Sequence, residues 1–401
     1  MELLTFKYNV KSGRHGWLRL TPAYSLKIVE ELVTRLPTSR RIYDPFCGTG
    51  TTALSAAYHG HEGITTDINP YLVWLAEAKT VDYSTRTLNA TEKYCDAAID
   101  LVDRQRVEPV DAPPIHNITR WWAPKALEFL CALRSAIEQV TRKGTPSHSL
   151  LLIAFCRTLI DLSNAAFNHQ SMSFGDKTHP TLDFGDTFST RYRDDVAFVL
   201  RGAAENPAGK ATVLLGDARD PSLVVEGPID LVITSPPYAN RMSYIRELRP
   251  YMYWLDYLHN GRDAGELDWS AIGGTWGIAT SRLAEWNRPE SKCDSHELQA
   301  AVEAIAHADN KNGAVLANYV AKYFDDMWAH FSGLVKVLGS GAEVHYVVGN
   351  STFYGTLVST EQLYAQMMKS VGFVDVKCHP LRKRNSKKEL VEFDVVAKWP
   401  G

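Results

Sequence analysis

The sequence predicts an α/β protein with a parallel sheet, helices on both of its faces, and two insertions, one helical and one irregular. Two strand–turn–helix units follow one another in residues 40–80, which is the pattern of a parallel sheet. Short apolar strands resume after residue 210 and again after residue 340, so distant parts of the chain complete the sheet. The helical insertion is predicted over 81–210 and the irregular one over 246–314. The remaining segments form one sheet domain: 1–80, 211–245 and 315–401.

Each element of the first part follows from its periodicity. Residues 24–36 place Ile28, Leu32 and Val33 on one helical face. The stretch 40–60 reads as a strand, a glycine-rich turn and a helix, RRIYDPFCGTGTTALSAAYHG. The stretch 62–80 reads as a strand, an acidic turn and a helix, EGITTDINPYLVWLAEAKT.

The rest of the chain alternates between helical segments and strands. The helical insertion contains LEFLCALRSAIEQV and SLLLIAFCRTLIDLSNAAF, and a polar stretch follows it. The sheet resumes with ATVLLGDARD and IDLVITSPPY, and a long helix from residue 314 is predicted to end at Gly339 and Gly341. The last strands are AEVHYVVGN, GFVDVKCHP and ELVEFDVVAKW, with a helix over 360–371. Insertions at strand ends fall on the side where such sheets bind ligands.

Composition limits the class of protein. The 401 residues are 45% hydrophobic and 22% charged, which is ordinary for a soluble globular protein. The net charge of −3 restricts any nucleic-acid surface to a local patch. Six cysteines without CxxC spacing argue against a zinc site and a disulfide framework. We expect a cytoplasmic protein without metal or membrane contact, since neither a signal peptide nor a run of 18 apolar residues is present.

Three strand ends carry residues suited to a nucleoside. Gly48 and Gly50 open the first turn and let a ligand approach the backbone. Asp67 ends the second strand, where a carboxylate accepts from a ribose diol, and Asp217 ends the third, where it can accept from an adenine amino group. The turn lacks the third glycine of the dinucleotide fingerprint and the lysine of a Walker A loop. Individually, each aspartate also fits a helix N-cap.

A buried strand runs directly into Ser-Pro-Pro-Tyr at residues 235–238. The two prolines fix two φ angles, remove two backbone donors and hold the preceding residues extended. The result is a stiff ledge that presents a hydroxyl, carbonyls and an aromatic ring, suited to something flat and polar. The alternative is a proline turn after an edge strand.

In combination, DPFCGTGTT, TTDINP, GDARD and DLVITSPPY resemble the S-adenosylmethionine-dependent DNA amino-methyltransferases. The resemblance implies a Rossmann-like methyltransferase sheet, S-adenosyl-L-methionine as cofactor and double-stranded DNA as substrate, with a cognate restriction endonuclease as a candidate partner. The implied cofactor residues are Thr21, Pro22, Asp44, Phe46, Gly48, Gly50, Asp67 and Asp217. The implied catalytic residues are Ser235, Pro236, Pro237 and Tyr238.

The first residue of the catalytic motif bears on the target base. In the family, serine is more typical of enzymes acting on cytosine N4 and aspartate of those acting on adenine, so Ser235 predicts cytosine N4. Adenine N6 is the alternative. A tRNA guanine-N2 methyltransferase is a weaker one, because those enzymes usually carry Asp-Pro-Pro-Tyr and an N-terminal RNA-binding module. A DNA-binding regulator that has kept the fold is a non-enzymatic alternative.

The ledge suggests how transfer proceeds. Ser235 and the Pro236 carbonyl would accept both hydrogens of the amine, so that its lone pair points at the methyl group in line. Tyr238 would stack on the extruded base, because a base inside the duplex cannot reach the cofactor. Alignment of the reactants supplies much of the rate enhancement. Ring-carbon methylation is disfavoured, since no cysteine follows a proline.

DNA contacts are predicted at two groups of arginines, Arg241, Arg246 and Arg249 after the ledge and Arg382 and Arg384 near the C-terminus. The polar loop 168–180 could read base edges or be a solvated connector. Trp121 and Trp122 could stack on nucleic acid or pack in a core. The helical insertion is a candidate target-recognition region.

Overall fold

A computed structural model describes residues 8–9, 12–18, 24–166, 173–174, 185–240, 243–275, 277–288, 295–308, 311–384 and 389–401. Three predicted site residues, Thr21, Pro22 and Arg241, lie outside these residues. Of the polar stretch from 167 to 184, the structure describes only residues 173 and 174.

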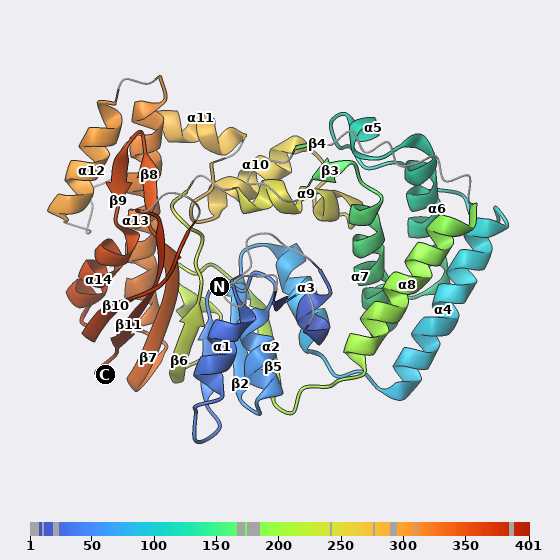
Figure 1. Cartoon of the computed structure of the whole chain (residues 1–401), viewed down its shortest axis with the longest axis horizontal. Coiled ribbons are helices and arrows are strands. Elements are labelled where there is room, and N and C mark those ends of the chain that lie inside the picture. The colour runs from blue at the N-terminus through green and yellow to red at the C-terminus, as the bar shows by residue number, and fades with distance from the viewer. Residues whose placement is uncertain are drawn as a thin grey trace.

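Within the described residues, seven strands form one sheet in the order β10-β11-β7-β6-β1-β2-β5 (Figure 1). The strands are β1 (Arg41–Asp44), β2 (Glu62–Asp67), β5 (Lys210–Leu215), β6 (Ile229–Thr234), β7 (Leu338–Gly349), β10 (Val374–Lys383) and β11 (Val391–Lys398). Strands β5, β2, β1, β6 and β7 are parallel, and β11 runs antiparallel to both of its neighbours. This order confirms the Rossmann-like methyltransferase sheet and its assembly from distant segments.

Helices cover both faces because successive residues of β1 point to opposite sides. Ile42 packs with Val29 of α1 (Leu26–Val33) and Ala56 of α2 (Thr51–Tyr58). Tyr43 belongs to the core of the other face, with Phe324 of α13 (Gly313–Leu334) and residues of α14 (Thr360–Val371). The helix α3 (Pro70–Thr80) follows β2, as predicted.

The predicted end of the long helix was wrong. Helix α13 ends at Leu334, and Gly339 and Gly341 lie inside β7. Gly339 packs closely against the start of β6, since a Cβ there would lie 3.1 Å from Pro228 and 3.3 Å from the Ile229 carbonyl. Gly341 has a φ of +78°, which glycine adopts without strain.

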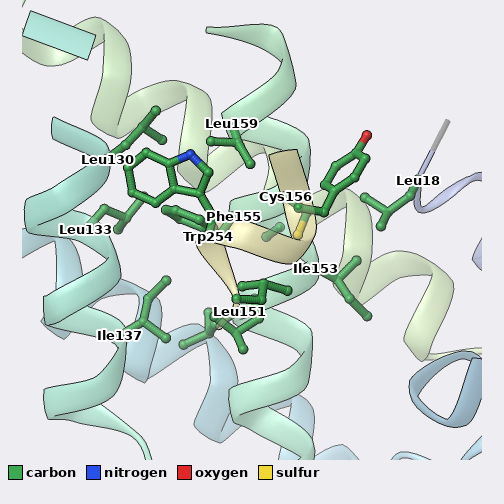
Figure 2. Packing of buried hydrophobic residues seen from close by; sticks show 14 of the residues in the cluster. Leu18, Leu130, Leu133, Ile137, Leu151, Ile153, Phe155, Cys156, Leu159 and Trp254 are labelled. Carbon is green, nitrogen blue, oxygen red and sulfur yellow. The ribbon is translucent and has the colours of Figure 1, made fainter. Parts of the chain in front are cut away.

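The described residues of the segment 81–210 form a helical layer beside the sheet (Figure 1). Its elements are α4 (Thr85–Asp103), α5 (Ile118–Trp121), α6 (Pro124–Val140), α7 (Pro146–Asp161), α8 (Gly185–Ala203), β3 (Ala165–Ala166) and β4 (Ser173–Phe174). Leucines of α6 and α7 surround Phe155 and Trp254 in its core (Figure 2). Trp121 and Trp122 are buried in the same core, which confirms the packing alternative for this pair.

The second insertion was predicted to be irregular, but its described residues are mainly helical, in short helices separated by the turn-forming residues that suggested irregular structure. It contains most of α9 (Tyr244–Trp254), together with α10 (Gly261–Ser270), α11 (Ile278–Glu285) and α12 (His296–Ala306). Short elements complete the described chain: η3 (Gly13–Gly16), η4 (Pro221–Leu223), β8 (Ser351–Phe353) and β9 (Thr356–Val358). In Figure 1, α9 and α10 lie above the sheet, between it and the helical layer.

A buried arginine near the N-terminus ties the sheet to the helical layer. Arg14 donates hydrogen bonds to the carbonyls of Lys79 and Val81 at the end of α3. It also donates to the carbonyls of Gly202 and Ala203 at the end of α8. Helix carboxyl ends leave carbonyls without an intrahelical partner and carry partial negative charge. One guanidinium therefore stabilises both helix ends at once.

Candidate active site

One pocket lies at the carboxyl ends of four parallel strands, β5, β2, β1 and β6. It encloses about 1060 Å³, part of which opens to solvent. Its lining includes six of the predicted cofactor and catalytic residues: Phe46, Gly48, Asp67, Asp217, Ser235 and Pro237. Helix α9 adds Tyr244, Ile245 and Leu248, and the segment 270–274 of the second insertion closes one side. The predicted cofactor residues and the predicted catalytic ledge therefore lie next to each other in one pocket.

The glycine turn has the backbone geometry that its sequence predicts. Gly48 and Gly50 have φ angles of +51° and +75°, in the left-handed region. A Cβ at Gly50 would lie 3.0 Å from the Ala76 side chain, so this glycine permits close packing on α3. A Cβ at Gly48 would meet nothing nearer than the Phe46 carbonyl at 3.8 Å. Gly48 therefore leaves space on the pocket side of the turn.

Asp67 braces this turn. Its Oδ2 accepts a hydrogen bond from the Gly48 amide at 3.1 Å, and its Oδ1 accepts one from the Asn69 amide at 2.9 Å. Burial raises the pKa of Asp67 to about 6, although these backbone amides favour the ionised form. Because a carboxylate offers about four acceptor sites, Asp67 can hold the turn and also accept from a ligand.

Asp44 lies behind the pocket and joins two strands. Its Oδ1 accepts from the Phe46 amide at 3.0 Å and from the Thr234 hydroxyl at 2.6 Å. Burial raises the pKa of Asp44 to about 7. Since Thr234 directly precedes the ledge, Asp44 links the glycine turn to the start of the ledge.

Asp217 is engaged by Arg219, a residue that the sequence interpretation did not single out. The Arg219 guanidinium donates to both Asp217 oxygens at distances between 2.7 and 3.0 Å. It also donates to the Ser270 carbonyl at 2.6 Å and to Asp326 at 3.1 Å. Arg219 thus connects Asp217 to the segment that closes the pocket. The spacing of two positions between Asp217 and Arg219 in GDARD could have indicated this ion pair from the sequence.

The ledge is held by hydrogen bonds from distant elements. The Ser235 hydroxyl donates to the Val347 carbonyl of β7 at 3.0 Å, which directs its proton away and leaves the oxygen as an acceptor. The Pro237 carbonyl accepts from the Tyr323 hydroxyl of α13 at 2.7 Å. Pro236 is buried and does not belong to the pocket lining.

Tyr238 contacts the C-terminal strands. Its hydroxyl donates to Glu392 Oε1 at 2.8 Å, and the Arg384 guanidinium lies 5.1 Å from its ring centroid. Arg382 donates to Glu392 Oε2 at 2.5 Å. The two arginines predicted to bind phosphate therefore have partners at the ledge. Glu392 was missed because no local signal links it to a tyrosine 154 positions away.

The other predicted arginines lie on α9. The Ser243 hydroxyl caps this helix at the Arg246 amide, at 3.1 Å. Arg246 Nε is buried and has no hydrogen-bond partner among the described residues. The Arg249 guanidinium lies 5.2 Å from the Trp121 ring centroid, at the edge of the helical layer.

The described residues contain neither a metal-binding cluster nor a membrane-spanning helix. Among these residues, no group of three or more histidine, cysteine, aspartate or glutamate side chains could hold a metal ion. None of the described helices combines the length and the apolar character needed to span a bilayer.

Comparisons with known proteins support a methyltransferase. The model of the D12 class N6 adenine-specific DNA methyltransferase family matches residues 26–105. The chain is 20% identical to the type II methyltransferase M.BsoBI of Geobacillus stearothermophilus, over 99% of this chain and 86% of that protein. It is 21% identical to the type II methyltransferase M.MvaI of Kocuria varians, over 91% and 81% respectively.

A solved rRNA methyltransferase, aviRa from Streptomyces viridochromogenes, aligns over 98% of this chain and 96% of its own, with 13% identity and a TM-score of 0.31. The family match contains the glycine turn and Asp67 but ends before the ledge. The fold assignment itself rests on the strand order given above.

Proposed function

We propose that this protein transfers a methyl group from S-adenosyl-L-methionine to an exocyclic amino group of a base in double-stranded DNA. The observation that carries the proposal is that the glycine turn, Asp67 and Ser235 line the same pocket. The similarity to two type II methyltransferases supports it. A cognate restriction endonuclease stays a prediction from the resemblance, and a cytoplasmic location stays a prediction from the composition.

The residues at the cofactor end fit an adenosine-containing methyl donor. The open space beside Gly48 lets a ligand approach the backbone. Asp67 is an acceptor for the ribose diol, and Phe46 and Leu248 offer apolar surface in the same pocket. Asp217 would accept from the adenine amino group, sharing its oxygens with Arg219. We assign Thr21 and Pro22 to the methionine end from the resemblance alone.

At the other end, the ledge would hold the amine. When bound, S-adenosylmethionine supplies a methyl group on a sulfonium, which the amino nitrogen takes up as the carbon–sulfur bond breaks and the nitrogen loses a proton to water. The Ser235 oxygen accepts one amine hydrogen, since its own proton is donated to Val347. The Pro236 carbonyl is proposed to accept the other. Tyr238 offers its ring to the extruded base, and stacking of this kind contributes about 1–3 kcal/mol per base.

Two bases are candidates, and different observations favour each. The matched family model describes adenine-N6 enzymes, so the comparisons favour adenine N6 over the cytosine N4 expected from the sequence. Cytosine N4 rests on Ser235 in the first position of the motif, which lies outside the matched residues 26–105. We therefore take adenine N6 as the first candidate and cytosine N4 as the second.

The test is methyl transfer from labelled cofactor to unmethylated genomic DNA and, in a separate reaction, to total tRNA. The DNA is then digested to nucleosides and analysed by mass spectrometry. N6-methyladenine or N4-methylcytosine in DNA supports the proposal and identifies the base. Label in tRNA with DNA unmodified contradicts the DNA substrate, and absence of label from both contradicts the enzyme itself. A Ser235→Ala variant serves as the matched control for contaminating activity.

A further inference from the structure

The ledge tyrosine is fixed by a buried carboxylate that the proposed function does not use. Glu392 is only 4% exposed and accepts the Tyr238 hydroxyl at 2.8 Å. Burial raises the pKa of Tyr238 well above its ordinary value, so the phenol stays protonated and can act as the donor. A phenol that donates to a buried carboxylate has a charge-assisted hydrogen bond, which is stronger than a neutral one.

Glu392 is itself held in place by the neighbouring strand. Arg382 of β10 donates to both of its oxygens, at 2.5 and 3.2 Å. Glu392 also pairs with Gly349 in the register of β11 with β7. Glu392 is thus held by its strand and by Arg382. Through its hydrogen bond to the hydroxyl, it therefore restrains the orientation of the Tyr238 ring.

Arg384 is positioned against the ring by a separate set of contacts. Its guanidinium donates to the Asn350 carbonyl at 2.9 Å and lies 5.1 Å from the Tyr238 centroid. It crosses the backbone at Gly349, where an added Cβ would overlap the guanidinium. Position 349 therefore has to be glycine for Arg384 to reach the ring. A cation at this distance is attracted to the ring face.

We propose that Glu392 and Arg384 are positioning residues that orient the Tyr238 ring for stacking on the extruded base. Glu392 fixes the hydroxyl end of the ring and Arg384 packs against the ring, so both act on the base through Tyr238. The inference rests on the proposed function, because it concerns how the ledge holds its base. It assigns Arg382 and Arg384 to the ledge instead of to DNA phosphates.

A double-mutant cycle tests the pairing. We expect Tyr238→Phe and Glu392→Met each to slow single-turnover methyl transfer about tenfold, because either one removes the same charge-assisted hydrogen bond. The double variant should be no slower than the slower single variant, since residues that act through one contact are not additive. Cofactor affinity should stay within about twofold of wild type.

Matched controls separate positioning from simple destabilisation. Asp394→Asn removes a second carboxylate of β11, one that pairs with His345 and does not contact the tyrosine, and it should leave the transfer rate unchanged. Gly349→Ala should displace Arg384 and slow transfer to the same extent as Arg384→Met. Thermal unfolding of every variant shows which of them are folded. If Glu392→Met does not fold, Tyr238→Phe still tests the hydrogen bond, because it removes only the hydroxyl and leaves the aromatic ring.

The outcomes distinguish this inference from the proposed function. Absence of methyl transfer to DNA by the wild-type protein contradicts the proposed function and, with it, this inference. An active wild type combined with additive effects of Tyr238→Phe and Glu392→Met overturns only the positioning role. A wild-type rate in both single variants overturns it as well.

Discussion

The two ends of the pocket are built in different ways. At the cofactor end, Asp67 accepts hydrogen bonds from Gly48 and Asn69, which lie 19 and 2 positions away. At the ledge end, Ser235 and Tyr238 contact Val347 and Glu392, which lie 112 and 154 positions away. The glycine turn and Asp67 are thus a local product of two strand–turn–helix units, although Asp217 joins them from the end of β5. The ledge takes its final geometry only when β7, β10 and β11 have joined the sheet.

If this difference is functional, substitutions at the two ends should have separable effects. The largest is expected for Ser235→Ala, which removes an acceptor for the amine and should lower the single-turnover rate by about 100-fold, the size seen when one polar contact to a reacting group is lost. Cofactor affinity should change less than twofold. Rapid-quench transfer and calorimetric titration measure the two quantities. A comparable loss of cofactor affinity in Ser235→Ala would contradict the separation between the cofactor end and the ledge end.

Asp67→Asn is the corresponding change at the cofactor end. It removes the charge that the ribose diol would meet, and the loss of a hydrogen bond to a charged group weakens binding by about 1.5–3 kcal/mol. We expect the affinity for S-adenosylmethionine to fall by 10-fold or more, as measured by calorimetry. The transfer rate at saturating cofactor should fall much less. Normal cofactor affinity in the Asp67→Asn variant would contradict a role for Asp67 in cofactor binding.

The same carboxylate should make cofactor binding depend on pH. Burial raises the pKa of Asp67 to about 6, so it is mostly ionised at pH 7.5 and mostly protonated at pH 5. Because the ionised form is the better acceptor, affinity should fall about tenfold on acidification across this range. Asp67→Asn should flatten the profile. Asp44→Asn should leave the fall near pH 6 in place, although the pKa of Asp44 is raised to about 7 by burial.

The smallest expected effect is on the salt dependence of DNA binding, which should differ between the two predicted groups of DNA-binding arginines. A phosphate contact contributes about 0.9 to the slope of log affinity for DNA against log salt concentration. Arg246→Met should lower the slope by about this amount, because Arg246 lies on α9, which lines the pocket, and is predicted to contact a phosphate there. Arg382→Met should not change it, because Glu392 already engages that side chain. Equal slopes for both variants and wild type would contradict the contact at Arg246.

The sequence was informative where structure is local. Gly48 and Asp67 were found because a strand, a turn and a helix lie within 20 residues, and the positive φ of Gly48 follows from that turn. Glu392 was not found, since a glutamate in an alternating strand usually faces solvent and only the sheet order brings it to Tyr238. For the same reason, Arg382 and Arg384 were predicted to contact DNA phosphates, and their contacts with Glu392 and Tyr238 were not foreseen.

Length and periodicity predicted the helices of residues 81–210, but not what they do. Their apolar faces pack on one another and on Trp254, so pattern alone identifies the core and leaves the exposed residues undefined. The division of the chain into a catalytic domain and two insertions, and a target-recognition role for 81–210, stay predictions. A position of the second insertion near the active site likewise stays a prediction. The link of segment 270–274 through Arg219 to Asp217 depends on tertiary contacts, which the sequence pattern does not reveal.

The most direct test of the central claim is to locate the methyl donor on the chain. Ultraviolet cross-linking of labelled S-adenosylmethionine, followed by peptide mapping, should place the label on peptides that contain Phe46 or Tyr244, which line the strand-end pocket. Excess unlabelled cofactor should prevent the labelling. Label confined to the surface formed by residues 110–114 and Arg134, which line another pocket in the described part of the chain, would contradict the account.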